Sequence, residues 1–528
     1  MLLSHAFIIP RYLDTFISGS LLGICFFSVW VQSVEIPGSF SPSIYPLATR
    51  SPSLNVWLDG EGSTLNRDWP KLWDLGHPMG WCGMIRIDNV VWQWLGPPTS
   101  NSNVEIPEAF GSPYLTPTQT TFKLTAGQMQ LTVSFFSPIE VRQFLAVNKP
   151  FGDFEIIQTE DLVKQSIPFM YLSFSAQSHD DRDHDVQVYS DISGEWVSGD
   201  REDSAIWWNT TVTPSSIFHR SSLQDPQPMT VINNQYQDAT VYYAMDARAN
   251  LTWKTSDVNI SRPMFIEQGA LDNETETEFR VINDRLPGFA FSVNLGKIRN
   301  TSSPIVWGLG SLRDPVVKYT SSDGIQDRRP FFYSDPRFSS GRIEDVIDFF
   351  MQDHDVAVRR ADALDSRILQ DIASVPTGKE GEQFGLVSLG ARLALSALDF
   401  TYSIVSDDKG ANQTDIKAFM KNTGIAPGAV NNAIAMYASL PAFIYLNATW
   451  IGYLLDASLE NQNSSTSQVN FGASCEIGPH PTATGGNPAD SVECTASMMI
   501  VAAAHVKTSG NNLYAQRYVS NIIARVVK

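Results

Sequence analysis

The sequence predicts an α+β multidomain protein, with an N-terminal β-sandwich domain followed by an all-α domain. Before about residue 340, β-branched and aromatic residues alternate in short runs separated by turns, a pattern typical of antiparallel sandwiches. After residue 340, apolar residues recur every three or four positions, which is the period of a helix. A chain of 528 residues is also too long for one compact core. We therefore expect three segments, at residues 1–33, 34–340 and 341–528.

The first segment has the features of a signal peptide. Phe16 to Val31 is an apolar run of the right length, Arg11 lies upstream, and Ser33 offers a small residue for cleavage. The run is short for a membrane-spanning helix. We expect a secreted protein; the alternative is a protein anchored in a membrane by residues 16–31.

N-glycosylation sequons agree with export. Eight asparagines begin the pattern N-x-[ST] without an intervening proline, and each is a predicted glycosylation site. They are Asn209, Asn250, Asn259, Asn273, Asn300, Asn412, Asn447 and Asn463. Cleavage of a signal peptide would remove Cys25 and leave Cys82, Cys475 and Cys494, which allows one disulfide and one odd thiol.

In the second segment, short strands are separated by turns. Phe122 to Pro138 predicts a hairpin that turns at Ala126-Gly127, and further strands are expected within Ala239–Ala247 and Phe289–Leu295. The charged run HDDRDHD, His179 to Asp185, lies between two strand patterns. It resembles a metal cluster, but neighbouring side chains of a tight turn point in different directions and seldom converge on one ion. We interpret it as a hairpin turn and expect no metal.

The third segment predicts about six helices in succession. The first spans Arg342 to Val375 and is ended by Pro376 and Gly378. The second spans about Gly381 to Ile404 and is apolar on most sides, which predicts a buried helix. The others are expected near Val430–Leu440, Ala448–Glu460, Val492–Val506 and Leu513–Val527.

Charge and motifs narrow the class of function. The formal net charge of −19 argues against binding to nucleic acid or anionic lipid, because phosphate would repel the protein. The sequence contains no G-x-S-x-G, Walker or H-E-x-x-H motif, and no GxGxxG after a strand. We expect no cofactor and a small-molecule substrate.

A tryptophan-rich block lies near the start of the second segment. It contains Trp57, Trp69, Trp73, Trp81, Trp92 and Trp94, with acidic residues among them. Exposed indoles beside carboxylates can line a pocket for a sugar or an amino acid, which makes Trp57, Trp73, Trp81 and Asp59 candidate substrate-binding residues. The alternative is that the block packs the β-domain against the helical domain.

The stretch SCEIGPHPTATGGNPADSVEC, from Ser474 to Cys494, holds the candidate catalytic residues. A disulfide between Cys475 and Cys494 fits an oxidising compartment. Glu493 begins an apolar helix, whose dipole favours the carboxylate anion and a role as base, and Glu476 would then be the acid. The alternative is a helix N-terminal carboxylate and a solvated loop residue without catalytic roles. Cys82 is interpreted as a small buried thiol rather than a nucleophile.

Several stretches resemble the glutaminase A-like family of secreted fungal proteins. They include Tyr45–Gly60, Arg67–Pro98, Tyr189–Asp200, LVSLGARLALSALDFT at Leu386–Thr401, and Leu440–Ser465. The resemblance implies a β-sandwich followed by a helical domain related to (α/α)6 toroids. It also implies extracellular hydrolysis of L-glutamine to L-glutamate and ammonia, with L-glutamine or a related amide as the substrate.

The chain departs from the family pattern in two respects. About six helices make half of such a toroid, so we expect a partial toroid and a shortened C-terminal part. In the loop, the family pattern H-D-[IL]-G and V-E-E-[CS] is matched by Cys475-Glu476-Ile477-Gly478 and Val492-Glu493-Cys494-Thr495. The His is lost, the Asp has become Glu476, the second Glu has become Cys494, and Glu493 is retained. Three hypotheses stay open: an amidohydrolase, a glycan-active enzyme that uses Glu476 and Glu493, and a non-catalytic member of the family.

Overall fold

The structure is a computed structural model that describes residues 40–510, apart from 61, 75, 99–102, 142, 149–153, 160, 407–411, 425–426, 465–472 and 487–490. The predicted signal segment and the helix predicted at Leu513–Val527 lie outside the described residues.

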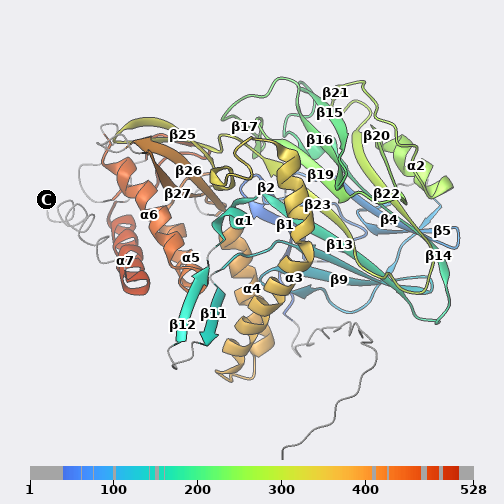
Figure 1. The fold of residues 1–528 in the computed structure, drawn as a ribbon, viewed down its shortest axis with the longest axis horizontal. Helices are drawn as coiled ribbons and strands as arrows, with labels where there is room; N and C mark the ends of the chain where they lie inside the picture. Colours follow the sequence, from blue (N-terminus) through green and yellow to red (C-terminus); the bar gives the residue numbers. More distant parts are fainter. Residues whose placement is uncertain are drawn as a thin grey trace, which may run out of the picture. The chain divides into compact units, whose positions relative to one another are not determined.

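Two sheets, antiparallel apart from the pairing of their short strand β6 (Val104–Glu105), form the predicted β-sandwich (Figure 1). The larger sheet contains, in spatial order, β21 (Arg280–Val281), β15 (Ala205–Val212), β16 (Ser216–Leu223), β19 (Thr240–Asp246), β23 (Ile305–Leu312), β13 (Phe169–Ser178), β10 (Met129–Phe136), β9 (Gln119–Ala126) and β7 (Glu108–Ala109), with β8 (Tyr114–Leu115) beside β9. The smaller sheet contains β20 (Leu251–Asp257), β22 (Pro287–Ile298), β14 (His184–Ser193), β4 (Trp81–Ile87), β5 (Val90–Leu95) and β6 (Val104–Glu105).

Aromatic side chains join the two sheets in a shared core. The ring of Trp94 on β5 lies 5.2 Å from that of Phe174 on β13, and Trp81 on β4 lies 5.2 Å from Phe135 on β10. Along β9, half-buried and buried residues alternate at every position, as expected for a strand with one face on the core. The predicted hairpin is confirmed: β9 pairs with β10, and Gly127 in the turn has a φ of 55°, which favours glycine.

The charged run at His179–Asp185 is a turn, but the prediction of a hairpin is wrong. The strand before it, β13, belongs to the larger sheet, whereas the strand after it, β14, belongs to the smaller sheet. The turn therefore crosses from one layer of the sandwich to the other. His184 at the start of β14 lies between two carboxylates, 2.6 Å from Asp88 and 3.1 Å from Asp180.

The helices after residue 340 are α3 (Ile343–Ala373), α4 (Glu380–Ser396), α5 (Ala433–Leu446), α6 (Thr449–Gln462) and α7 (Ser491–Ser509). The predicted helix at Arg342–Val375 is confirmed by α3, which packs on the outer face of the larger sheet through stacked rings of Phe350 and Tyr171, 4.0 Å apart. The second predicted helix is wrong in two ways. It ends at Ser396, and Leu386, Val387 and Leu393 on α4 are exposed.

A third sheet corrects the prediction that the C-terminal domain is all-α. It contains β27 (Asn412–Met420), β26 (Leu398–Ser406), β25 (Gly324–Pro330), β24 (Val317–Ser321) and β28 (Thr482–Ala483). Leu398–Ile404, predicted as helix, pairs instead with β27 because tertiary pairing of its aromatic and β-branched residues outweighs the helical pattern. β24 and β25 precede residue 340, whereas β26, β27 and β28 follow it. This sheet therefore contains strands from both predicted domains.

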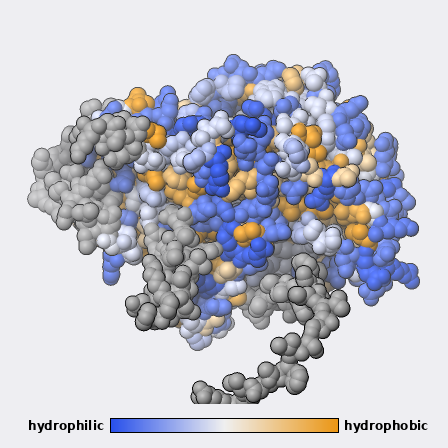
Figure 2. Space-filling model, viewed as in Figure 1, coloured by the Kyte–Doolittle hydropathy of each residue, from blue (hydrophilic) through white to orange (hydrophobic). Residues whose placement is uncertain are grey.

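The remaining elements are β1 (Ile44–Ser51), β2 (Leu54–Asp59), β3 (Lys71–Leu72), β11 (Gln143–Asn148), β12 (Phe154–Thr159), α1 (Leu162–Ser166), β17 (Val231–Ile232), β18 (Gln235–Tyr236) and α2 (Val258–Gln268). None of the helices in the described ranges is long and apolar enough to span a membrane. The face of the molecule in Figure 2 is mostly hydrophilic, with small apolar patches between hydrophilic residues.

Candidate functional site

The loop between α6 and α7 is fixed to the third sheet by backbone hydrogen bonds. The N–H of Val430 donates to Gly478 O (2.8 Å), the N–H of Ile477 donates to Val430 O (3.0 Å), and the N–H of Lys318 donates to Pro481 O (2.9 Å). The short strand β28 then pairs with β24. These bonds fix the position of His480, which is 5% exposed.

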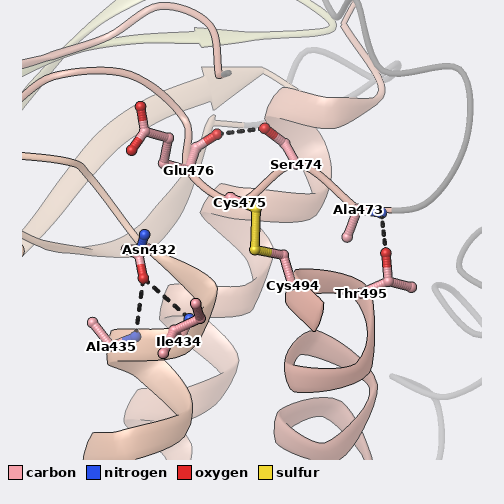
Figure 3. The surroundings of a disulfide bond; sticks show 9 residues. All are labelled: Asn432, Ile434, Ala435, Ala473, Ser474, Cys475, Glu476, Cys494 and Thr495. Atoms are coloured by element: carbon pink, nitrogen blue, oxygen red, sulfur yellow. Dashed lines mark hydrogen bonds between the residues drawn. A yellow bond between two sulfur atoms is a disulfide. The ribbon is translucent and has the colours of Figure 1, made fainter. Parts of the chain in front are cut away.

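A disulfide joins the start of this loop to the first turns of α7. The structure pairs Cys475 with Cys494, the pairing that the sequence predicts, with their Cα atoms 5.1 Å apart. Beside the disulfide, the Thr495 hydroxyl accepts a hydrogen bond from the N–H of Ala473 at 2.7 Å (Figure 3).

The two predicted catalytic carboxylates lie in different surroundings. Glu493 is exposed in the first turn of α7. Glu476 is half-buried, and burial raises the pKa of its carboxyl group. Figure 3 shows its carboxylate directed away from the disulfide.

A second group of polar residues lies further along the same loop, at its contact with the sandwich region. We call Tyr236, Asp399, Lys421 and His480 the Lys421 cluster. His480 Nε2 lies 3.1 Å from Asp399 Oδ2, and His480 Nδ1 lies 2.7 Å from the Tyr236 hydroxyl. Tyr236 comes from β18, Asp399 from β26, and Lys421 directly follows β27. Three separate parts of the chain thus meet at one histidine.

Burial sets the direction of this hydrogen-bond chain. It lowers the pKa of His480 to about 4, so the imidazole is neutral at pH 7. It raises the pKa of Tyr236 well above its usual value, so the phenol keeps its proton. The Tyr236 hydroxyl therefore donates to His480 Nδ1, and His480 Nε2–H donates to the Asp399 carboxylate.

Lys421 differs from the other members of the cluster because its ammonium group has no hydrogen-bond partner among the described residues. The side chain is 2% exposed, and its Nζ lies over two aromatic rings, 4.8 Å from the centroid of Tyr236 and 5.2 Å from that of Trp73. Burial lowers the pKa of Lys421 to about 8; the charge of Arg313 lowers it further, whereas Asp399 and Asp74 oppose the shift.

Charged residues surround the cluster. Arg313 stacks on Tyr236, 4.2 Å from the ring centroid, and its Nε donates to Asp238 at 2.6 Å. Towards the surface, Asp74 Oδ2 accepts a hydrogen bond from Asn234 Nδ2 at 2.8 Å and lies 2.8 Å from His77 Nδ1. Because Asp74 and His77 are partly exposed, this is the solvent side of the cluster.

The site is closed in this structure. Two cavities of about 20 Å³ flank the cluster, one lined by Arg313 and Asp399 and the other by Asn234 and Tyr236. Each has room for about one water molecule. A larger surface hollow, of about 450 Å³, is lined by residues such as Asn250 and Asn294 and contains no ionisable side chain. The larger hollow therefore lacks groups for acid–base chemistry.

Only one predicted substrate-binding residue lies at the Lys421 cluster. Trp73 does, through its contact with Lys421. Trp81 is fully buried in the sandwich core and Trp57 is 2% exposed with its Nε1 donating to Asn55 Oδ1, so neither indole can line an open pocket. Asp59 forms a surface ion pair with Lys71 at 3.8 Å. Packing, the alternative reading of the tryptophan block, explains Trp57 and Trp81.

Cys82 and the predicted glycosylation sites complete the comparison with the sequence. Cys82 is fully buried, and burial raises the pKa of its thiol to about 12, which disfavours a nucleophilic thiolate.

Six sequon asparagines are exposed: Asn209, Asn250, Asn259, Asn273, Asn300 and Asn463. Asn447 is an exception, because its side chain is 3% exposed and its Oδ1 accepts from the N–H of Thr449. The side chain of Asn412 lies outside the described residues.

Comparison with known proteins supports the family resemblance. Residues 154–371 match the model of a domain of unknown function, DUF5127, and residues 382–524 match the glutaminase A six helical-hairpin domain. Glutaminase A of Aspergillus oryzae is 28% identical over 491 residues, which cover 90% of this chain, and a probable glutaminase of Arthroderma benhamiae is 25% identical over 84% of it. This chain is similar to the glutaminase A-like family over most of its length. It spans 65% and 50% of the lengths of these two relatives.

A solved structure was also similar at a low level. The putative kojibiose phosphorylase from human microbiome matches with a TM-score of 0.35 and 10% identity, over 77% of this chain and 43% of that one. A similarity this low carries no conclusion about the function of this chain.

Two of the stretches that carry the family resemblance meet the loop at Ser474–Cys494 at the Lys421 cluster. Trp73 comes from Arg67–Pro98, Asp399 from LVSLGARLALSALDFT, and His480 from the loop at Ser474–Cys494. Sequence reasoning did not select Asp399, although an acid in so apolar a stretch was a usable signal. Lys421 and Tyr236 gave no signal of their own, because only tertiary pairing brings them to His480.

Proposed function

We propose that the protein is a secreted amidohydrolase that converts L-glutamine to L-glutamate and ammonia at the Lys421 cluster. The observation that carries this proposal is the buried hydrogen-bond chain from Tyr236 through His480 to Asp399. A neutral histidine oriented by a carboxylate is the usual arrangement of a general base. The names of the two glutaminase relatives support the choice of substrate.

The proposed chemistry moves one proton along this chain. His480 Nδ1 accepts the proton of the Tyr236 hydroxyl as that hydroxyl takes a proton from the attacking water, and Asp399 stabilises the imidazolium. The new C–O bond forms at the side-chain amide carbon. The same chain then returns the proton to the amide nitrogen, the C–N bond breaks, and ammonia leaves. Because the site is closed here, substrate entry requires movement of the partly exposed rim around Trp73 and Asp74.

Ammonia release from L-glutamine tests this proposal. We expect the purified chain to release ammonia, and the variants Tyr236→Phe and Asp399→Asn to lower kcat by about 10²–10⁴-fold, the usual contribution of acid–base catalysis. Circular dichroism and thermal unfolding of each variant separate loss of chemistry from loss of fold.

Glu476→Gln and Glu493→Gln are the matched carboxylate controls, and each should keep most of the activity. If Glu493→Gln abolishes ammonia release while Tyr236→Phe does not, the carboxylate pair predicted from the sequence is the active site and the Lys421 cluster is not. Absence of release by the folded wild-type chain would refute glutamine hydrolysis.

The proposed export is tested separately through the sequons. Expressed with its own N-terminus in a eukaryotic host, the protein should be recovered from the medium, and an N-glycosidase should lower its mass. Replacing the exposed Asn300 by Gln should remove one glycan, whereas Asn447→Gln should leave the glycan mass unchanged because that side chain is 3% exposed. Retention inside the cell, or an unchanged mass after glycosidase treatment, would contradict export.

A further inference from the structure

We infer that the ammonium group of Lys421 binds the α-carboxylate of the substrate, and that the site selects free α-amino acids over amides within a peptide chain. The inference rests on the proposed function for the location of the reaction, and it names the part of the substrate that the cluster recognises. Nothing else in the site requires a lysine at this position, since Asp399, His480 and Tyr236 already form a complete hydrogen-bond chain.

The first argument is the unmet hydrogen-bonding capacity of the ammonium. A lysine ammonium has three N–H donors, and buried polar groups in proteins are nearly always paired. Lys421 is 2% exposed, yet no acceptor among the described residues lies within hydrogen-bond distance of its Nζ. The rings of Tyr236 and Trp73 attract the charge without accepting a conventional hydrogen bond. We therefore assign the missing partner to an oxygen of a bound ligand.

A second buried lysine close by shows that the lack of hydrogen-bond partners is particular to position 421. Lys417 on β27 is also 2% exposed, but its Nζ lies 2.7 Å from Asp415 Oδ1 and 2.9 Å from Glu460 Oε2. The fold can thus supply two carboxylates to a buried lysine four residues away. At Lys421 it supplies aromatic rings and leaves the donors unused.

The surrounding charges indicate what kind of molecule supplies the oxygen. Arg313 is paired with Asp238, so Lys421 is the unpaired cation among the residues of the site that the structure describes. Asp399 and Asp74 lie near enough to Lys421 to influence its charge, and Asp74 faces the solvent side. A simple anion would meet these two carboxylates. A zwitterion suits the site better, with its carboxylate on Lys421 and its ammonium beside Asp74.

This arrangement separates free amino acids from peptides. In a peptide-bound glutamine, both the α-amine and the α-carboxylate are consumed in amide bonds, so neither Lys421 nor Asp74 would have its charged partner. Burying the Lys421 ammonium against a neutral amide leaves its charge unpaired, and a site built this way rejects such a ligand strongly.

Binding of the reaction product tests the inference without any turnover. Titration calorimetry would compare L-glutamate with L-glutamate α-amide, which differs only in lacking the α-carboxylate. We expect the wild type to bind L-glutamate at least about tenfold more tightly than the α-amide, as for a charge-assisted hydrogen bond. Lys421→Met should abolish this preference, Lys421→Arg should keep it, and Lys379→Met, at a residue whose side chain is 69% exposed, is the matched control that changes nothing.

The pH dependence adds a readout that a purely structural role would not change. Because the pKa of Lys421 is lowered to about 8 in a setting of Arg313, Asp399, Asp74 and a neutral His480, the wild-type preference should decline as the pH rises through 8. In Lys421→Arg the preference should persist to pH 9.5, since a guanidinium stays protonated.

The inference is overturned if the folded wild type binds neither ligand, or if Lys421→Met keeps the preference for L-glutamate. Its failure is distinct from that of the proposed function. Lys421-dependent binding of L-glutamate without ammonia release from L-glutamine would refute the hydrolase and leave the carboxylate site intact. If Lys421→Met leaves ammonia release unchanged and the wild type shows no preference for the α-carboxylate, the carboxylate site is refuted. The proposed hydrolysis of L-glutamine then still stands.

Discussion

Two buried clusters at β27 contain a lysine each, and they differ in how completely their charges are paired. In the Lys417 cluster, formed by Arg328, Asp415, Lys417 and Glu460, the lysine contacts both acids and Arg328 donates to Asp415 Oδ2 at 2.6 Å. In the Lys421 cluster, the carboxylate of Asp399 is paired with His480 and the ammonium of Lys421 has no partner among the described residues.

The difference separates a structural role from a functional one. Both clusters join residues before position 340 to residues after it, through Arg328 and Asp415 in one and through Tyr236 and His480 in the other. The Lys417 cluster joins two strands of the third sheet to α6, whereas the Lys421 cluster joins that sheet to Tyr236 in the sandwich region. Among the described residues of the two clusters, Lys421 alone has donors without a partner, which the fold does not need and a ligand would use.

The largest expected effect comes from breaking the Lys417 cluster. Lys417→Met leaves the carboxylates of Asp415 and Glu460, whose side chains are 24% and 23% exposed, without their shared cation. Removing one partner of a buried ion pair costs about 3–5 kcal/mol, and the partial exposure of both acids places this variant near 3 kcal/mol. Urea unfolding would measure the loss in the free energy of unfolding.

Lys379→Met is the control for this prediction. Its ammonium is on the surface and its loss should change stability by less than about 0.5 kcal/mol. A Lys417→Met variant as stable as the wild type would show that the paired cluster is not structural, and the contrast with Lys421 would then lose its meaning.

The sequence predicted the elements whose pattern is local. The alternation in Phe122–Pro138 and the helical period of Arg342–Val375 depend on neighbouring residues, and both appear as predicted in β9, β10 and α3. The prediction for Gly381–Ile404 was wrong after Ser396, because Leu398–Ile404 gains more from pairing with β27 than from continuing a helix.

The site shows the same limit more strongly. The sequence directed attention to the loop at Ser474–Cys494, but it selected the acids of that loop, Glu476 and Glu493, and passed over His480. The His480 side chain gains its role from Asp399 and Tyr236, which are 81 and 244 positions away in the chain. No rule of sequence spacing connects residues that are so far apart in the chain. In the folded protein, the backbone hydrogen bonds between Val430 and the loop help to hold His480 in its position.

The smallest predicted effect has the opposite sign to that of Lys417→Met. The lowered pKa of Lys421, about 8 in the fold against 10.5 for the unfolded chain, means that the folded state binds its proton more weakly. Below pH 8 both states are protonated, so the cost of burying the charge is fully present. Between pH 8 and 10.5 only the unfolded state keeps the proton, so this cost declines as the pH rises.

Lys421→Met should therefore make the protein more stable at pH 7, while Lys417→Met makes it less stable. The contacts with Tyr236 and Trp73 offset part of the burial cost, so we expect a gain of about 1–2 kcal/mol. Urea unfolding at pH 7 and pH 9.5 would measure it, and the gain should shrink at the higher pH. A destabilised Lys421→Met variant would mean that the ammonium is paired in solution, and the reason to assign it a ligand would disappear. A stable variant that also loses its preference for the α-carboxylate would show that the fold tolerates this unpaired charge for the sake of binding.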